Sequence, residues 1–79
     1  MTIEKAVGQE LCFWRNKKGL SQEKLGFEAN LHRTYISIIE RGLKSPTINT
    51  VVRLCNALEI TPDKFLKNVM QRIAAGKRK

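Results

Sequence analysis

The sequence has few of the residues on which enzyme and metal chemistry depends. It contains one histidine and two cysteines among 79 residues. Cys12 and Cys55 lie far apart and no CxxC pair occurs, so a zinc site has no ligand set. A glycine-rich phosphate loop and a cluster of carboxylates are also absent. We therefore expect no enzyme activity, no catalytic residues, no metal site and no cofactor.

Long apolar stretches are absent as well. No apolar run approaches the roughly 20 residues that a membrane-spanning helix needs. The chain start shows no basic region followed by an apolar stretch, so no secretory signal is visible. We therefore expect no membrane partner, and reduced cysteine thiols in place of a disulfide.

Acidic residues are scarce relative to basic ones. The chain has 15 Lys and Arg against 7 Asp and Glu, which gives a net charge of +8 and a pI of about 10.0. A small chain this basic usually binds a polyanion, and nucleic acid is the first candidate. An anionic membrane surface is the second, but the basic residues do not follow one face of a single amphipathic helix. The hydrophobic fraction of 42% is enough for one small packed domain.

Apolar residues recur with helical spacing through most of the chain, and no strand-like alternation is sustained. Thr2, Ser21 and Thr61 are suitable residues to cap helix starts. We expect an all-α fold with five helices, at about residues 3–18, 22–29, 33–41, 47–58 and from 62 onward. The domain would cover residues 1–75, followed by a frayed basic tail at residues 76–79.

The second and third helices have the composition of a helix-turn-helix. Gly26 and Ala29 lie on the inward side of the second helix, where two crossing helices need small residues. The residues placed to fill the angle between the two helices are Leu25, Leu31, Ile36 and Ile39. We therefore predict a helix-turn-helix over residues 22–41, whose second helix projects outward. The buried stripes of the first and fourth helices are expected to be Ile3, Val7, Leu11 and Trp14, and Ile48, Val51, Leu54, Cys55 and Leu58.

Four sequence blocks in this region fall in the order and spacing of a known family. SQEKLG, RTYISIIERG, SPTINTVVRLCNALEI and TPDKFL resemble the lambdoid-repressor-like (XRE-type) helix-turn-helix family of phage repressors and Cro-like regulators. The resemblance covers about residues 11–66, and LHRTYISIIERG in so short a chain resembles restriction–modification controller proteins in particular. It implies a five-helix, lambda-repressor-like domain in a bacterial or phage cytoplasm, associated with the nucleoid.

The resemblance implies that the third helix enters the DNA major groove with its N-terminal residues leading. The candidate base contacts on its exposed face are Arg33, Thr34 and Ser37. Arg33 has the reach and the fork geometry to bond guanine O6 and N7. Ile38 also turns towards the DNA side, where it either contacts thymine methyl groups or is an isolated apolar surface residue.

Candidate contacts to the DNA backbone surround this helix. By resemblance, Gln22 at the start of the second helix bonds a phosphate, and a simple capping role is the alternative. Histidine caps helices poorly, so His32 either touches a phosphate or is a neutral surface side chain. The remaining backbone candidates are Tyr35, Arg41, Lys44 and Ser45.

Glu40 is a carboxylate on a helix that is expected to face DNA. In the family, an arginine late in the first helix pairs with this glutamate, and Arg15 occupies that position here. The resemblance therefore implies an Arg15–Glu40 ion pair that orients the third helix and is structural, not catalytic.

A single recognition helix reads few bases, and family members pair so that two such helices lie about one DNA turn apart. We expect the fifth helix to form the dimer interface because it has more apolar residues than a small core needs. The interface candidates are Phe65, Leu66, Val69, Met70 and Ile73, with Val69 and Met70 preferred. The alternative is that these residues face the domain's own core.

These observations favour a transcription regulator that binds a pseudo-palindromic operator as a homodimer, with double-stranded DNA and a second copy of itself as partners. A controller of this kind would regulate restriction–modification genes. Activation would require contact with RNA polymerase, for which Glu23 or Glu28 is a candidate. The alternative function is that of an antitoxin, or of a DNA-binding subunit that acts mainly through protein–protein interaction.

Overall fold

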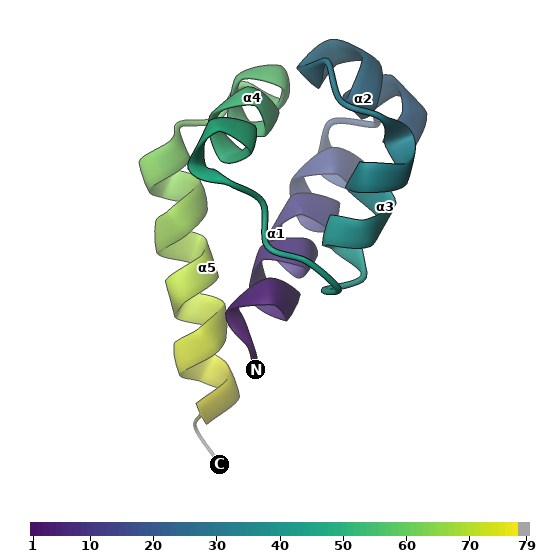
Figure 1. The fold of residues 1–79 in the computed structure, drawn as a ribbon. Helices are drawn as coiled ribbons and strands as arrows, with labels where there is room; N and C mark the ends of the chain where they lie inside the picture. Colours follow the sequence, from purple (N-terminus) through teal and green to yellow (C-terminus); the bar gives the residue numbers. More distant parts are fainter. Residues whose placement is uncertain (78–79) are drawn as a thin grey trace.

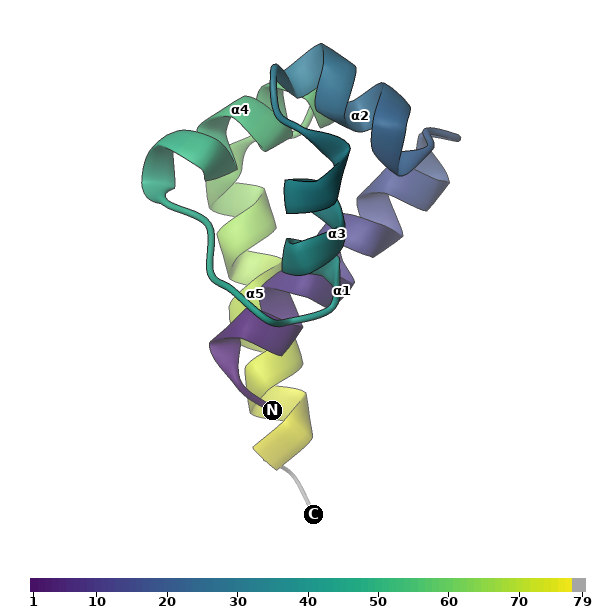
Figure 2. The same ribbon diagram turned by 45° about the vertical axis from the view of Figure 1, so that its right-hand side comes forward.

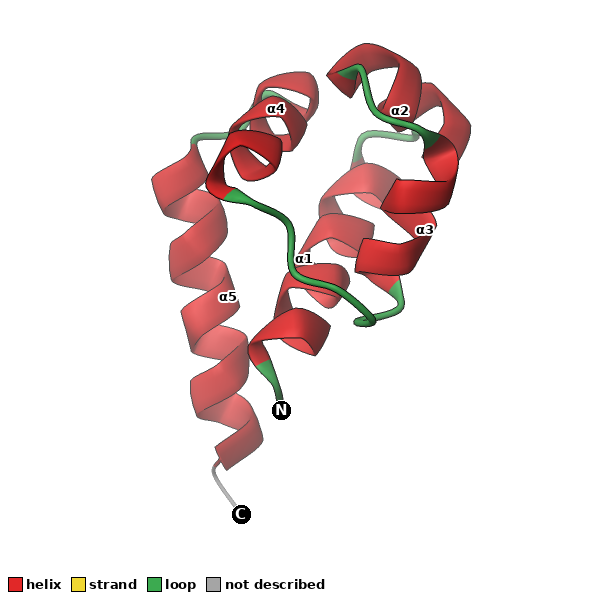
Figure 3. Cartoon of the chain, viewed as in Figure 1, coloured by secondary structure: helices red, strands yellow, loops and turns green. Residues whose placement is uncertain are grey.

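The computed structural model describes residues 1–77 and folds this stretch into five α-helices (Figure 1). They are α1 (Ile3–Lys17), α2 (Gln22–Ala29), α3 (Arg33–Glu40), α4 (Ile48–Leu58) and α5 (Pro62–Lys77). Turns and loops join the helices, and no strand occurs between residues 1 and 77 (Figure 3). The expected all-α fold is therefore confirmed. None of the helices in this part of the chain is long and apolar enough to cross a bilayer.

Hydroxyl side chains begin three of the helices by accepting hydrogen bonds from free backbone amides. Thr2, Ser21 and Thr47 each bond the amide three residues ahead, at 3.2, 3.0 and 3.2 Å. Thr47 is therefore the cap of α4 and lies just before the helix, although the sequence suggested that it was the first helical residue. Helix α3 ends before Gly42, whose φ of 73° suits a residue without a Cβ.

The end of the chain continues the last helix further than expected. Helix α5 extends through Gly76 and Lys77, the first two residues of the expected tail. The other two, Arg78 and Lys79, lie outside the described residues.

Helix α1 lies at the centre of the fold, between α3 on one side and α5 on the other (Figures 1 and 2). Helix α2 packs against α3 and α4, and α4 leads the chain back to α5. All five helices contribute to one core, whose fully buried apolar side chains include Leu11, Leu25, Ile36, Ile39, Leu54, Leu58, Phe65 and Val69. Cys55 belongs to this core, and its burial raises the pKa of the thiol to about 11, so the thiol stays protonated at neutral pH.

Two residues of the expected apolar stripes lie on the surface. Ile3 is 49% exposed and Ile48 is 72% exposed, so the prediction of burial was wrong at these positions. Each is the first residue of its helix. The stripe reaches the core only one turn later, at the buried Val7 in α1 and the buried Val51 in α4.

A buried carboxylate joins α1 to α5. Glu10 is 2% exposed and accepts hydrogen bonds from Trp14 Nε1 at 2.6 Å, from Asn68 Nδ2 at 2.8 Å and from Arg72 Nε at 2.7 Å. These donors satisfy the carboxylate, which would otherwise be costly to bury. This network was not predicted from the sequence. The available signal was the position of Glu10 on the apolar face of α1, one turn after Val7 and one turn before Trp14.

Helices α1 and α3 approach so closely that their contact requires a glycine. A Cβ added at Gly8 would lie 2.5 Å from the backbone oxygen of Ile39 and 2.7 Å from that of Glu40. The obstructing atoms are backbone atoms of a packed helix, so no side-chain rotation can relieve the clash. Gly8 therefore sets the distance between the central helix and α3.

We predict that Gly8→Ala destabilises the protein by about 1–3 kcal/mol, because the added methyl group forces α1 and α3 apart. The measurement is equilibrium urea unfolding followed by circular dichroism. The neighbouring exposed variant Gln9→Ala is the control and should stay within about 0.5 kcal/mol of the wild type. Helix propensity alone would make Gly8→Ala about 1 kcal/mol more stable, and that result would contradict the close contact.

Candidate nucleic-acid interface

Helices α2 and α3 form a pair joined by a three-residue turn, residues 30–32 (Figure 2). Asn30 ends α2 in the left-handed conformation with a φ of 59°, and the Leu31 amide donates to the Gly26 carbonyl at 2.7 Å. A Cβ at Gly26 would lie 2.5 Å from the Leu31 backbone oxygen. A glycine at this position therefore permits the tight turn between the two helices, as the sequence indicated.

Helix α3 has one buried side and one outward side. Ile36 and Ile39 are fully buried, which fixes the rotation of the helix about its axis. Arg33 and Thr34 are exposed in the first turn, and the half-buried Ser37 follows one turn later on the same side. We call Arg33, Thr34 and Ser37 the recognition strip. Three of the four candidate base contacts thus lie together on the outward side of α3.

Ile38, the fourth candidate, flanks the recognition strip. Its side chain is half-buried, in contrast to the fully buried Ile36 and Ile39. It lies four residues after Thr34 and therefore next to it on the helix surface. The arrangement leaves part of an aliphatic side chain available beside the polar residues of the strip.

Arg33 has a weak ionic partner on α2. Its Nη1 lies 3.8 Å from Glu23 Oε2, and the two side chains are 64% and 77% exposed. A contact this long and this solvated contributes little, because water screens the charges and side-chain entropy opposes the pairing. The Arg33 guanidinium is therefore free to exchange this partner for an acceptor on another molecule.

His32 caps α3, contrary to the expectation that histidine is a poor cap. Its Nδ1 accepts a hydrogen bond from the Thr34 backbone amide at 3.1 Å, while the side chain stays exposed. The sequence predicted either a phosphate contact or a plain surface role for His32, and this bond was not predicted. The missing signal is local geometry, because the extended backbone of His32 places the ring beside the first free amides of the helix.

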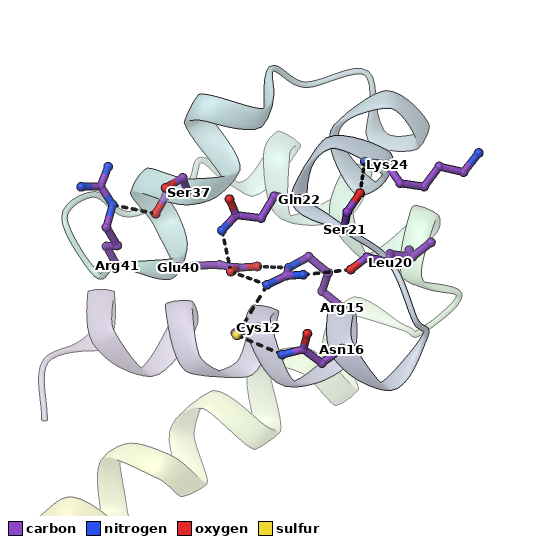
Figure 4. A network of polar contacts seen from close by, with 10 residues as sticks. All are labelled: Cys12, Arg15, Asn16, Leu20, Ser21, Gln22, Lys24, Ser37, Glu40 and Arg41. Atoms are coloured by element: carbon purple, nitrogen blue, oxygen red, sulfur yellow. Dashed lines mark hydrogen bonds and ion pairs between the residues drawn. The ribbon is translucent and has the colours of Figure 1, made fainter.

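A partly buried ion pair fixes the other end of α3 (Figure 4). Arg15 Nε donates to Glu40 Oε2 at 2.6 Å and Arg15 Nη2 donates to Glu40 Oε1 at 3.0 Å, so the pair is bidentate. Arg15 Nη1 also donates to the Leu20 carbonyl at 2.8 Å. The side chains are 14% and 7% exposed, and the hydrogen bond to Glu40 raises the pKa of Arg15 above its ordinary value. This is the ion pair that the resemblance implied, and it joins α1 to α3.

The same carboxylate holds Gln22 at the start of α2 (Figure 4). Gln22 Nε2 donates to Glu40 Oε1 at 3.0 Å. The amide nitrogen has two hydrogens, and this bond uses one of them. Gln22 is therefore held in one orientation with a second N–H left to donate, which is compatible with the phosphate contact considered for it.

Cys12 lies beneath this network, and its contacts here were not predicted from the sequence. Its Sγ accepts from Asn16 Nδ2 at 3.3 Å, and Arg15 Nη2 lies 3.8 Å away (Figure 4). The spacing of three and four residues along α1 brings these groups together. The sulfur contributes a weak acceptor that helps to hold the Arg15 side chain in place.

The other candidate backbone contacts occupy different environments. Tyr35 is half-buried and packs against the core, so only part of its side chain is available. Arg41 is exposed, and its Nε donates to the Ser37 carbonyl at 3.3 Å. Lys44 and Ser45 are exposed in the loop that follows α3.

The preferred dimer contact Val69 was assigned wrongly. Val69 is fully buried and Phe65 is 1% exposed, so both fill the protein's own core and cannot form the centre of an interface. On α5, Leu66 and Met70 are exposed, whereas Ile73 is half-buried and packs against the core. The cause is the orientation of α5, which the contact with α1 determines and which helical spacing alone leaves open.

Comparisons with known proteins agree with this geometry. Residues 14–65 match the helix-turn-helix family. The chain is 45% identical over 51 residues to control protein C.BamHI of Bacillus amyloliquefaciens, which covers 65% of this chain and 63% of that protein. It is 36% identical over 66 residues to control protein C.SmaI of Serratia marcescens, which covers 84% of this chain and 79% of that protein.

A solved structure supports the same assignment. The restriction–modification controller protein C.AhdI from Aeromonas hydrophila superposes with a TM-score of 0.76 at 37% identity, over 78% of this chain and 94% of that one. The aligned part covers less than two thirds of C.BamHI but more than two thirds of C.SmaI. The resemblance stated from the sequence is thereby confirmed. The chain belongs to the helix-turn-helix family of DNA-binding regulators and is similar to restriction–modification control proteins.

Proposed function

We propose that this protein binds a pseudo-palindromic operator as a homodimer and regulates transcription of restriction–modification genes. The observation that carries the proposal is the recognition strip on α3, which lies outward while Ile36 and Ile39 anchor the opposite side. The net charge of +8 supplies a general attraction to DNA phosphates. The similarity to control proteins supports the regulatory role.

In this proposal, the recognition strip reads base edges in the major groove. Arg33 exchanges its solvated contact with Glu23 for a bidentate bond to guanine. Thr34 and Ser37 offer hydroxyl groups, and the accessible part of Ile38 lies against thymine methyl groups. Specificity therefore comes from one short helix, and each base contact must be held in a defined position.

Contacts to the DNA backbone frame the strip and set its register. Gln22, oriented by Glu40, donates its remaining N–H to a phosphate at the start of α2. The exposed Lys44 provides a point charge beyond the end of α3. The other members of this group are His32, Tyr35, Arg41 and Ser45.

The Arg15–Glu40 pair makes this arrangement rigid. Glu40 receives hydrogen bonds from α1 and from α2, although it belongs to α3 itself. One carboxylate thus links the three helices that present the candidate DNA contacts. Loss of its charge should disturb both the fold and the Gln22 contact.

The proposed dimer interface uses exposed apolar residues of α4 and α5. Leu66 and Met70 are 40% and 58% exposed and lie one turn apart on α5. Ile48 and Val52 are the corresponding exposed pair on α4. Burying these side chains against a second copy would remove apolar surface from water and bring two recognition strips onto one DNA face.

The proposed place of action is the cytoplasm, at promoters on the nucleoid, for a protein of bacterial or phage origin. For activation, the exposed Glu28 is a candidate contact with RNA polymerase, since its only described ionic partner is Lys24 at 3.8 Å. Glu23 serves less well because it faces Arg33.

We predict that Arg33→Ala weakens operator binding by about 1–3 kcal/mol and relaxes the preference at one base position. The measurement is a gel-shift titration against the operator selected from random DNA and against random DNA itself. Lys44→Ala is the comparison variant, because loss of a phosphate contact should weaken binding to both DNAs and reduce the salt dependence. Equal loss on both DNAs for Arg33→Ala would remove it from base recognition.

We predict that Glu40→Gln lowers the free energy of unfolding by about 1–3 kcal/mol, because it leaves the Arg15 guanidinium without its anion. Thermal or urea unfolding measures the loss, and the operator affinity of the folded variant should also fall. Glu28→Gln is the matched control, since its exposed pair with Lys24 is worth little. If both variants had the same stability as the wild type, the orienting role of Glu40 would have to be abandoned.

We predict that Met70→Lys converts a dimer into a monomer of 9.0 kDa, because it places a charge in the proposed apolar interface. Sedimentation equilibrium at micromolar concentration measures the mass. Phe27→Lys is the control, because Phe27 is equally apolar and 81% exposed but lies on α2. A wild-type protein that sediments as a clean monomer would contradict the dimer, and a dimeric Met70→Lys would contradict the interface.

A further inference from the structure

The cap of α3 differs in kind from the caps of the neighbouring helices. Helices α1, α2 and α4 begin with hydroxyl caps from Thr2, Ser21 and Thr47, and none of these groups titrates near neutral pH. Helix α3 begins with the imidazole of His32, whose Nδ1 accepts from the Thr34 amide at 3.1 Å. His32 is also the single histidine of the sequence. The one titratable cap among these four therefore stands on the helix that carries the recognition strip.

The hydrogen bond defines the chemical form of the ring. Nδ1 can accept only when it has no proton, so the ring is neutral and its proton is on Nε2. Protonation turns both ring nitrogens into donors, and the bond to Thr34 is then lost. It also places a positive charge at the positive end of the α3 dipole, which further disfavours the helix start.

The charged groups beside the ring can be named. Arg33 follows His32 in the chain, and Glu23 of α2 faces Arg33 at 3.8 Å. Arg15, from α1, is engaged with Glu40 at the opposite end of α3. The Arg33–Glu23 contact is solvated on both sides, so the balance of the cap is set mainly by the ring itself and the Thr34 amide.

We propose that His32 is a positioning residue for DNA reading: its neutral imidazole holds the first turn of α3, and with it Arg33 and Thr34, in the geometry that discriminates an operator from other DNA. The inference rests on the proposed function. Arg33 and Thr34 are the first two residues of α3, so loss of the cap displaces them first. Discrimination therefore falls when the ring takes up a proton.

Total affinity for DNA follows a different course. A protonated ring at the edge of the interface adds one cation near the phosphates and strengthens binding to any sequence. The neutral ring, in contrast, has only its Nε2–H to offer a phosphate. Acidification thus exchanges sequence-selective binding for general binding, and the ratio of operator to random-DNA affinity is the quantity that reports on His32.

The test compares wild type, His32→Asn and His32→Ala from pH 5.5 to 7.5. Asparagine caps helices without titrating in this range, and alanine removes the cap. Fluorescence titrations with operator and random duplexes give the discrimination ratio. In the free protein, without DNA, NMR measures the chemical shift of the Thr34 amide and the rate at which its hydrogen exchanges with solvent.

Protonation of the ring on acidification should lower the wild-type ratio about fivefold, the size expected for one helix cap. The ratio for His32→Ala should be about fivefold below the wild-type value at pH 7.5, whatever the pH. The ratio for His32→Asn should stay within about twofold of that wild-type value. The Thr34 amide should follow the imidazole titration in the wild type only.

Each contrary outcome has a defined meaning. A Thr34 amide that ignores the imidazole titration overturns the cap itself. A responsive amide together with an unchanged ratio in His32→Ala overturns the positioning role. Absence of sequence-selective binding by every variant at pH 7.5 contradicts the proposed function and removes this role with it, while the NMR result still decides whether the cap exists.

Discussion

The partly buried ion pair between Arg15 and Glu40 is the interaction on which the position of α3 depends. A helix of eight residues is too short to be stable by itself, so its position must come from contacts with the rest of the fold. Glu40 is the last residue of that helix, where a carboxylate is unfavourable next to the negative end of the helix dipole. The bidentate guanidinium of Arg15 offsets this cost, and Gln22 donates a further hydrogen bond to the same carboxylate.

Helix α1 transmits this constraint to the remainder of the molecule. Gly8 brings the backbone of α1 against the end of α3, and Glu10, two residues later on another side of α1, binds Asn68 and Arg72 of α5. The central helix thus holds a helix on each side through the missing side chain of Gly8, the buried Glu10 and the partly buried Arg15. Since α5 and α4 also bear the exposed apolar residues of the proposed dimer interface, the spacing between two recognition strips would depend on the same contacts.

The two ends of α3 are held by interactions of different strength. Glu40 at the C-terminal end is largely excluded from water and makes charge-assisted bonds on two sides. His32 at the N-terminal end makes one neutral hydrogen bond in full contact with solvent. The stable end lies against the protein, and the adjustable end carries Arg33 and Thr34. This division is suited to a helix whose leading residues must adapt to a DNA surface.

Local sequence features determined the helices and the outward side of α3. Cap residues such as Thr2 and Ser21 act on amides three positions away, and the spacing of Ile36 and Ile39 selects the buried side without reference to distant residues. The Arg15–Glu40 pair could also be predicted, but only from resemblance to a family, because the two residues are 25 positions apart in the sequence. Its geometry is a property of the folded chain.

The tertiary structure alone decided which apolar residues of α5 turn inward and which polar residues are buried. The spacing of Phe65, Leu66, Val69 and Met70 permits several orientations of the helix, and packing against α1 chose the one that buries Phe65 and Val69. The burial of Glu10 likewise required donors more than 50 residues away. Caps and periodicity are encoded within a few residues, whereas the rotation of one helix against another depends on the simultaneous fit of side chains from the whole core.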